Sequence, residues 1–147
     1  MIGFLMVVLA QVPDFDRRCG NPMLESMGWT VVAATVLSAS GDHSIRVRIG
    51  ERDVTVHPPG VAGVNPAFGA YITQNVAGKR VEIAINPSRW PNEGKHPKHV
   101  DGMVTVERQG DLGLLLIQSG VARFVRPKPY TLSGYKSCLY QLADRSR

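Results

Sequence analysis

The chain has 147 residues, of which 44% are apolar and 20% charged, and its net charge is +5. This length and composition are typical of one globular domain; they exclude disorder over most of the chain, and the lack of any run of about 18 apolar residues excludes a polytopic membrane protein. The charge is unevenly placed, because residues 120–147 carry six Lys/Arg and one Asp while the rest of the chain is neutral. This basic end favours an anionic partner such as nucleic acid or a charged lipid surface, unless it serves only to keep the chain soluble.

The chain begins with an apolar, uncharged stretch over residues 1–12. It is shorter than the roughly 20 residues of a membrane-spanning helix, so we expect no transmembrane helix. Three interpretations stay open, namely a packed strand or helix, an export signal that lacks a positive n-region, and an interfacial anchor. Residues 13–28, with two prolines and two glycines, indicate a linker. We therefore divide the chain into an apolar N-terminal arm and linker, 1–28, and one folded domain, 29–147.

The two cysteines, Cys19 and Cys138, belong to no CxxC pair, which argues against a zinc ribbon or a thioredoxin-type motif. They pair if the compartment is oxidising and stay as two buried thiols if it is reducing. The sequence does not determine the compartment, although the missing n-region favours the cytoplasm slightly over export.

Three predicted strands follow the linker. Residues 30–40 are rich in β-branched side chains, residues 44–49 alternate between apolar and polar, and residues 54–57 continue after a short turn. Strands joined by such turns predict an antiparallel meander.

Helices and strands then alternate towards the C-terminus. Apolar residues four apart predict a helix over 66–76, and Gly78 ends it. A long loop with three prolines suits a binding or active-site edge better than a simple connection. The remaining elements that we predict are a strand at 81–85, this loop at 86–99, a strand at 102–107, a short helix in the stretch 111–122 that Gly120 ends, and a helix at 135–145.

Two segments carry a resemblance to a known family. Residues 67–85, AFGAYITQNVAGKRVEIAI, are similar to a helix and a Gly-Lys-x-Val strand of the staphylococcal nuclease (thermonuclease) family. Residues 114–124, LLLIQSGVARF, are similar to its small helix that ends in Gly-hydrophobic-Ala, and the turn at residues 40–42 resembles its Asp-Gly-Asp turn. The resemblance covers residues 30–145. It implies a mainly β fold with α, a five-stranded OB-fold barrel of the staphylococcal-nuclease type with two or three helices.

The family hydrolyses DNA and RNA with one calcium ion, two arginines that clamp the phosphate, and a carboxylate that orients water. Matched by position, Asp42 corresponds to the first metal ligand, and Ala62 replaces the second. His57 replaces the first arginine, Asn65 replaces the glutamate, and Asp101 replaces the second arginine. Because Asn is no general base and an aspartate repels phosphate, the resemblance implies a degenerate hydrolytic site.

A second set of residues suits binding. The loop 86–99 combines tryptophan with lysines, as proteins that hold single strands do, unless the tryptophan only closes the barrel edge. With the basic C-terminal segment, this loop gives the expected nucleic-acid contacts, which are Trp90, Lys95, Lys98, Arg123, Arg126 and Lys128.

The sequence predicts no cofactor. Ca²⁺ is expected, at Asp42, only if the chain is a nuclease. The histidines raise a further hypothesis, a transition-metal site at one barrel mouth, although loop histidines are more often only solvated. The four are His43, His57, His96 and His99.

The expected function is a non-catalytic staphylococcal-nuclease-like domain that binds nucleic acid, DNA or RNA, or a protein. Its apolar N-terminal arm suits a protein partner, as in one subunit of a larger assembly. The first alternative is a metal-dependent nuclease with a rearranged site around Asp42, His57, Asn65 and Asp101. The second is a pure protein–protein adaptor, which nucleic-acid affinity with a steep salt dependence would oppose.

Overall fold

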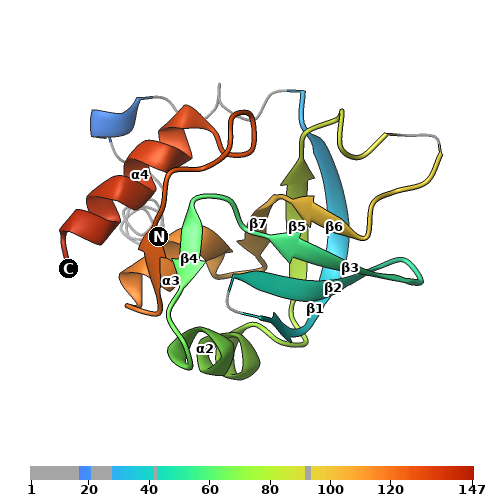
Figure 1. The fold of residues 1–147 in the computed structure, drawn as a ribbon, viewed down its shortest axis with the longest axis horizontal. Coiled ribbons are helices and arrows are strands. Elements are labelled where there is room, and N and C mark those ends of the chain that lie inside the picture. The colour runs from blue at the N-terminus through green and yellow to red at the C-terminus, as the bar shows by residue number, and fades with distance from the viewer. Residues whose placement is uncertain (1–16, 21–27, 42, 92–93) are drawn as a thin grey trace, which may run out of the picture.

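A computed structural model describes residues 17–20, 28–41, 43–91 and 94–147 (Figure 1). Its elements are, in chain order, η1 (Arg17–Cys19), β1 (Thr30–Ser40), β2 (Ser44–Ile49), β3 (Arg52–His57), β4 (Val61–Gly63), α2 (Ala67–Asn75), β5 (Arg80–Ile85), β6 (His99–Asp101), β7 (Met103–Val106), β8 (Gly110–Asp111), α3 (Leu112–Gln118), β9 (Ala122–Phe124) and α4 (Gly134–Arg145). None of the described helices is long and apolar enough to cross a membrane.

The predicted meander is confirmed. Strands β1, β2 and β3 pair antiparallel in succession, with Val47 of β2 opposite Val54 of β3. The alternation along β2 sorts its side chains as expected: Ile45 and Val47 are fully buried, whereas Arg46 lies on the outer face and binds Asp53 at 3.0 Å. The period of two in the sequence therefore fixes which face of this sheet enters the core.

The sheet extends well beyond the meander. Seven strands lie in the order β6-β3-β2-β1-β5-β7-β8, and β4 and β9 form a separate two-stranded sheet. The larger sheet is mixed because β6 runs parallel to β3, while its other pairs are antiparallel. A β-sheet combined with helices is what the sequence predicts. The ladders of the described residues give an open sheet and no closed barrel.

Four short strands were not predicted, and one helix is shorter than the stretch expected to contain it. The helix expected within residues 111–122 and ended by Gly120 spans Leu112–Gln118, and Gly120 adopts a positive φ of 79° that turns the chain away, as expected. Residues 122–124 then pair with β4 instead of continuing the helix. The unpredicted strands β4, β6, β8 and β9 have two or three residues each, too few to show a hydrophobic period.

The helices cover the core as predicted. On α2, Phe68 and Ile72 are fully buried, and Val76 at its end is too. Spacing by four places these three side chains on one helix face, against β1.

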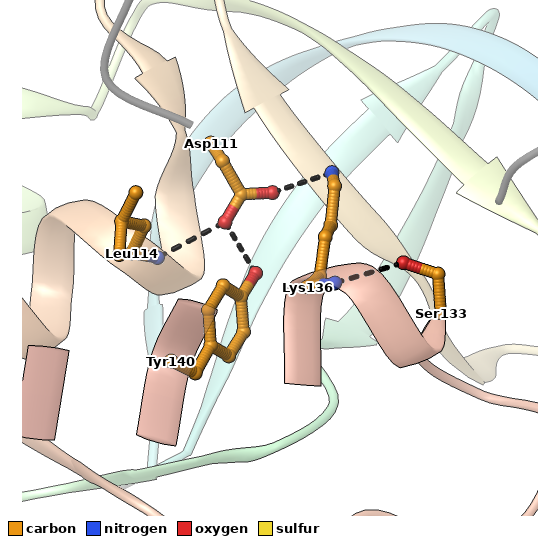
Figure 2. A network of polar contacts seen from close by, with 5 residues as sticks. All are labelled: Asp111, Leu114, Ser133, Lys136 and Tyr140. Carbon is orange, nitrogen blue, oxygen red and sulfur yellow. Dashed lines mark hydrogen bonds and ion pairs between the residues drawn. The ribbon is translucent and has the colours of Figure 1, made fainter. Parts of the chain in front are cut away.

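A buried polar network joins α3 to α4 (Figure 2). Asp111 caps the N-terminus of α3 by accepting from the backbone N–H of Leu114 at 3.0 Å. The same carboxylate accepts from Lys136 Nζ at 2.7 Å and from the hydroxyl of Tyr140, both on α4. Asp111 is only 4% exposed, and these hydrogen bonds compensate its carboxylate for the loss of contact with water.

A disulfide between Cys19 and Cys138 joins η1 to α4. It decides between the two states that the sequence left open. Bonds of this kind persist in oxidising compartments, which counts against the slight preference for the cytoplasm. The apolar stretch 1–12 lies outside the described residues, so its three interpretations, its role towards a protein partner and the domain boundary at residue 28 stay predictions.

Candidate functional site

The parallel pairing of β3 with β6 builds the centre of the site. Its register places His57 opposite Asp101 and Val56 opposite Val100. The two valines point into the core, with 0% and 8% exposed, so the histidine and the aspartate lie together on the other face. Residues 44 positions apart are thus brought side by side by a strand of three residues.

His57 and Asp101 form a half-exposed pair. His57 Nδ1 lies 3.0 Å from Asp101 Oδ1, and the two side chains are 34% and 30% exposed. The other ring nitrogen, Nε2, lies 3.3 Å from the carbonyl oxygen of Val61. The hydrogen bond from His57 holds the pKa of Asp101 below its ordinary value of 3.8; burial opposes this, while the charges of His57, Lys128 and Arg89 add to it.

Two cavities border Asp101 of this pair. One, of about 250 Å³, is lined by Ser44, Thr55 and His57, and the other, of about 310 Å³, by Trp29, Arg89 and Tyr130 among others. The two cavities share four lining residues, and we name the two together the β6 groove. The shared wall consists of His99, Val100, Asp101 and Lys128.

The β6 groove is cationic. Arg89 and Lys128 line it from two different segments, the loop after β5 and the segment between β9 and α4. The carboxylate among its lining residues, Asp101, is paired with His57. An anion that enters therefore meets two fixed positive charges and a carboxylate that is already hydrogen-bonded to His57.

An exposed aromatic ring stands at the rim. Tyr130 is 81% exposed, and its backbone has a positive φ of 64°, which is uncommon outside glycine. Asn86 Nδ2 donates to the Tyr130 carbonyl oxygen at 3.3 Å and so ties this turn to the loop after β5. Tyr130 thus lines the same cavity as Arg89 and Lys128, and its side chain is largely open to solvent.

The structure brings together two of the four residues predicted for a rearranged active site. His57 and Asp101 are paired, whereas Asn65 lies exposed before α2 and lines neither cavity. Asp42 lies outside the described residues.

Among the predicted nucleic-acid contacts, Lys128 is the one that lines the groove. Lys95, Lys98 and Arg126 are exposed but line neither cavity. Arg123 is engaged by Asp144, whose carboxylate lies 2.7 Å from its Nε.

Trp90 requires a correction. We expected its ring to offer a surface for bases, but it is only 6% exposed and belongs to the hydrophobic core. His96 stacks on it with ring centroids 4.0 Å apart. This burial favours the other interpretation that the sequence allowed, in which the tryptophan is a packing residue.

Neither Arg89 nor Tyr130 is among the nucleic-acid contacts expected from the sequence. Arg89 lies in the loop that was singled out for binding, directly before Trp90. Tyr130 follows Lys128 by two residues in the basic segment. Each residue type was visible in the sequence, as a cation or an aromatic ring in a proline-rich stretch. Only the tertiary structure shows that the two residues line the same cavity.

The predicted transition-metal site finds no support in the described part of the chain. No three His, Cys, Asp or Glu side chains there come together as metal ligands. The histidines have other partners: His43 Nδ1 accepts from the N–H of Gly63, and His96 Nε2 lies 2.8 Å from the Pro91 carbonyl oxygen.

Compared with known proteins, the chain matches no protein-family model and no curated protein.

Proposed function

We propose that the chain is a non-catalytic, staphylococcal-nuclease-like domain whose β6 groove binds a single-stranded nucleic acid. The observation that carries this proposal is the composition of the groove. Arg89 and Lys128 supply positive charge from two segments of the chain, and Tyr130 supplies an exposed ring. Proteins that hold single strands combine these two features, because the cations attract phosphates while an aromatic face stacks on a base.

The strand order supports the proposed OB-type fold. Strands β6 and β7 stand near opposite ends of the seven-stranded order, yet only Gly102 separates them in the chain. Because strands near the two ends of the sheet follow each other in the sequence, the sheet has to curve back towards itself, as the sheet of a small barrel does. At position 102, a Cβ would lie 2.5 Å from Ile83 Cγ2 of β5. A glycine therefore allows the close approach to β5 at the point where the chain passes from β6 to β7.

The His57–Asp101 pair favours binding over hydrolysis. At the two positions that correspond to phosphate-clamping arginines, this chain has a histidine and an aspartate that engage each other at 3.0 Å. The Asp101 carboxylate therefore already has His57 as a hydrogen-bond partner. Loss of one electrostatic or acid–base group typically lowers a rate by about 10²- to 10⁴-fold, and here both clamps are replaced.

The test uses an end-labelled single strand incubated with the full chain in calcium or in EDTA. We expect a shifted but intact strand in both buffers, seen on native and denaturing gels of the same samples. Calcium-dependent cutting that Asp42→Ala removes would instead favour the metal-dependent nuclease. An intact strand that does not shift would refute nucleic-acid binding and favour a protein–protein adaptor.

Variants then locate the binding surface. Lys128→Ala is expected to lower the slope of log affinity against log salt by about 0.7, the value for one phosphate contact on a single strand. Tyr130→Ala is expected to weaken binding by about 5- to 150-fold, and Tyr130→Phe to restore it, because stacking needs the ring but not the hydroxyl. Lys79→Ala removes one exposed positive charge between α2 and β5, outside both cavities, and is the matched control. An equal effect of Lys79→Ala and Lys128→Ala would show that only net charge matters.

A further inference from the structure

We propose that Asp101 makes the β6 groove selective for guanine, by accepting hydrogen bonds from the Watson–Crick edge of a base held in the larger cavity. The inference rests on the proposed binding of a single strand and specifies which strand is bound most tightly. Asp101 lines both cavities of the groove, and its side chain is 30% exposed. A carboxylate repels phosphate, so in a cationic groove it suits selection among ligands and not affinity for the backbone.

The Asp101 carboxylate is oriented by the protein and still available to a ligand. His57 Nδ1 lies 3.0 Å from Oδ1 and fixes the orientation of the group. Among the residues that the structure describes, Oδ2 has no hydrogen-bond partner. The hydrogen bond from His57 holds the pKa of Asp101 below 3.8, so the carboxylate is ionised near neutral pH and can only accept hydrogen bonds. Oδ1 keeps a second lone pair, so both oxygens can face a ligand.

The larger cavity has the lining that a base requires. Its volume of about 310 Å³ is at the lower end of the range for small-molecule pockets, roughly 300–1,000 Å³. Trp29 and Tyr130 both line it, and Tyr130 is 81% exposed. Aromatic side chains of this kind stack on bases, so a base that enters the cavity has the Asp101 carboxylate among its neighbours.

The hydrogen-bond donors of the bases decide which base fits. An ionised carboxylate offers two acceptor oxygens, and proteins read unpaired bases on their Watson–Crick edges. Guanine presents two adjacent donors there, N1–H and the N2 amino group, which match the two oxygens. Adenine and cytosine present an amino group beside a ring nitrogen that accepts, and thymine presents one N–H between two carbonyl oxygens. These acceptors repel the carboxylate, so guanine is the base that the site favours.

The base, and not the sugar, is the group that we assign to Asp101. The 2′-hydroxyl of ribose is also a donor that a carboxylate can bind. In the larger cavity, however, Asp101 is grouped with two aromatic side chains, which stack on bases. The preference for guanine is therefore expected in DNA, which has no 2′-hydroxyl, and a preference confined to RNA would overturn the assignment.

The test compares short thymidine DNA strands that differ only in one central base, by fluorescence anisotropy with the full chain. We expect the strand with guanine to bind about 5- to 150-fold more tightly than the strand with thymine, the range for one bidentate contact with a base. Hypoxanthine, which keeps N1–H but lacks the amino group, should lie between them. Equal affinity for all central bases would overturn guanine selection and leave the proposed function intact, whereas no binding of any strand would refute both.

Two variants then assign the selectivity to Asp101. Asp101→Asn keeps the size of the side chain and replaces one acceptor with a donor, so the ratio of guanine to thymine affinity should fall towards one, although loss of the negative charge strengthens binding of every strand. Asp53→Asn is the matched control, because this aspartate on β3 is 37% exposed, pairs with Arg46 and lines neither cavity. It removes the same charge and should leave the ratio unchanged. An unchanged ratio in Asp101→Asn, or an equal fall in both variants, would overturn the proposal.

Discussion

Two aspartates show how the same side chain serves two regions of this protein. Asp111 lies at the N-terminus of α3 and contacts α4. It is 4% exposed and accepts hydrogen bonds from a backbone N–H, a lysine and a tyrosine (Figure 2). The Asp101 side chain, in the β6 groove, is 30% exposed and has one side-chain partner, His57.

The difference lies in what each carboxylate leaves available. Three donors surround the buried Asp111 carboxylate, so this residue stabilises the fold, and it lines neither cavity of the β6 groove. Asp101 borders two cavities and shares its surroundings with Arg89 and Lys128. A buried carboxylate with three hydrogen-bond donors, such as Asp111, is typical of a structural contact between helices. A partly exposed carboxylate beside a cavity, such as Asp101, is typical of a ligand-binding surface, the role that we propose for the β6 groove.

The strongest test of this comparison is Asp111→Ala. It removes the cap of α3 and leaves Lys136 unpaired at a side chain that is 18% exposed, so we expect a loss of about 3–5 kcal/mol in the free energy of unfolding. Urea denaturation measures it. Asp111→Asn keeps the cap acceptor and should lose less. A loss below about 1 kcal/mol in Asp111→Ala would show that the network does not join the helices.

Removal of the disulfide, which also involves α4, provides the second test. Cys19→Ser should lower the free energy of unfolding by about 2–4 kcal/mol, because the bond closes a loop across 119 positions. Denaturation of the wild type in a dithiol reductant should give the same loss, and the reductant should not change the variant. Equal stability of wild type and variant under oxidising conditions would mean that the bond does not form.

Asp101 is expected to matter less for stability, and in a way that depends on pH. Because its pKa is lowered in the folded state, its contribution is present above the ordinary value near 3.8 and is lost as pH falls through the folded value. Denaturation midpoints of wild type and Asp101→Asn should therefore differ near pH 5 and converge in stronger acid. A difference that persists at the lowest pH would contradict an ionised pair.

The smallest effect is expected at Arg123. It is exposed and pairs with Asp144, and exposed ion pairs contribute little to stability. Arg123→Ala should leave the denaturation midpoint unchanged and should weaken binding of a single strand less than Lys128→Ala does. Stronger binding in Asp144→Asn would indicate that the pair withholds Arg123 from phosphates.

The comparison of the two aspartates also separates what could be predicted from what could not. Asp111 stands before an apolar run and is followed by Leu114, so a helix start there follows from the sequence. Its contacts with Lys136 and Tyr140 do not, because they join segments 25 and 29 residues apart. The family resemblance placed His57 and Asp101 at related positions, but their direct pairing depends on the register of β3 and β6.

The sequence by itself determined the elements whose residues are neighbours along the chain. The alternation of apolar and polar residues predicted the meander and the buried face of β2. Apolar residues spaced by four predicted the buried face of α2, and the surplus of Lys and Arg identified the basic C-terminal end. Only the tertiary structure decided the pairing of Cys19 with Cys138, the burial of Trp90 and the β6 groove. These depend on strands of two or three residues and on contacts between distant segments, which leave no periodic signal in the chain.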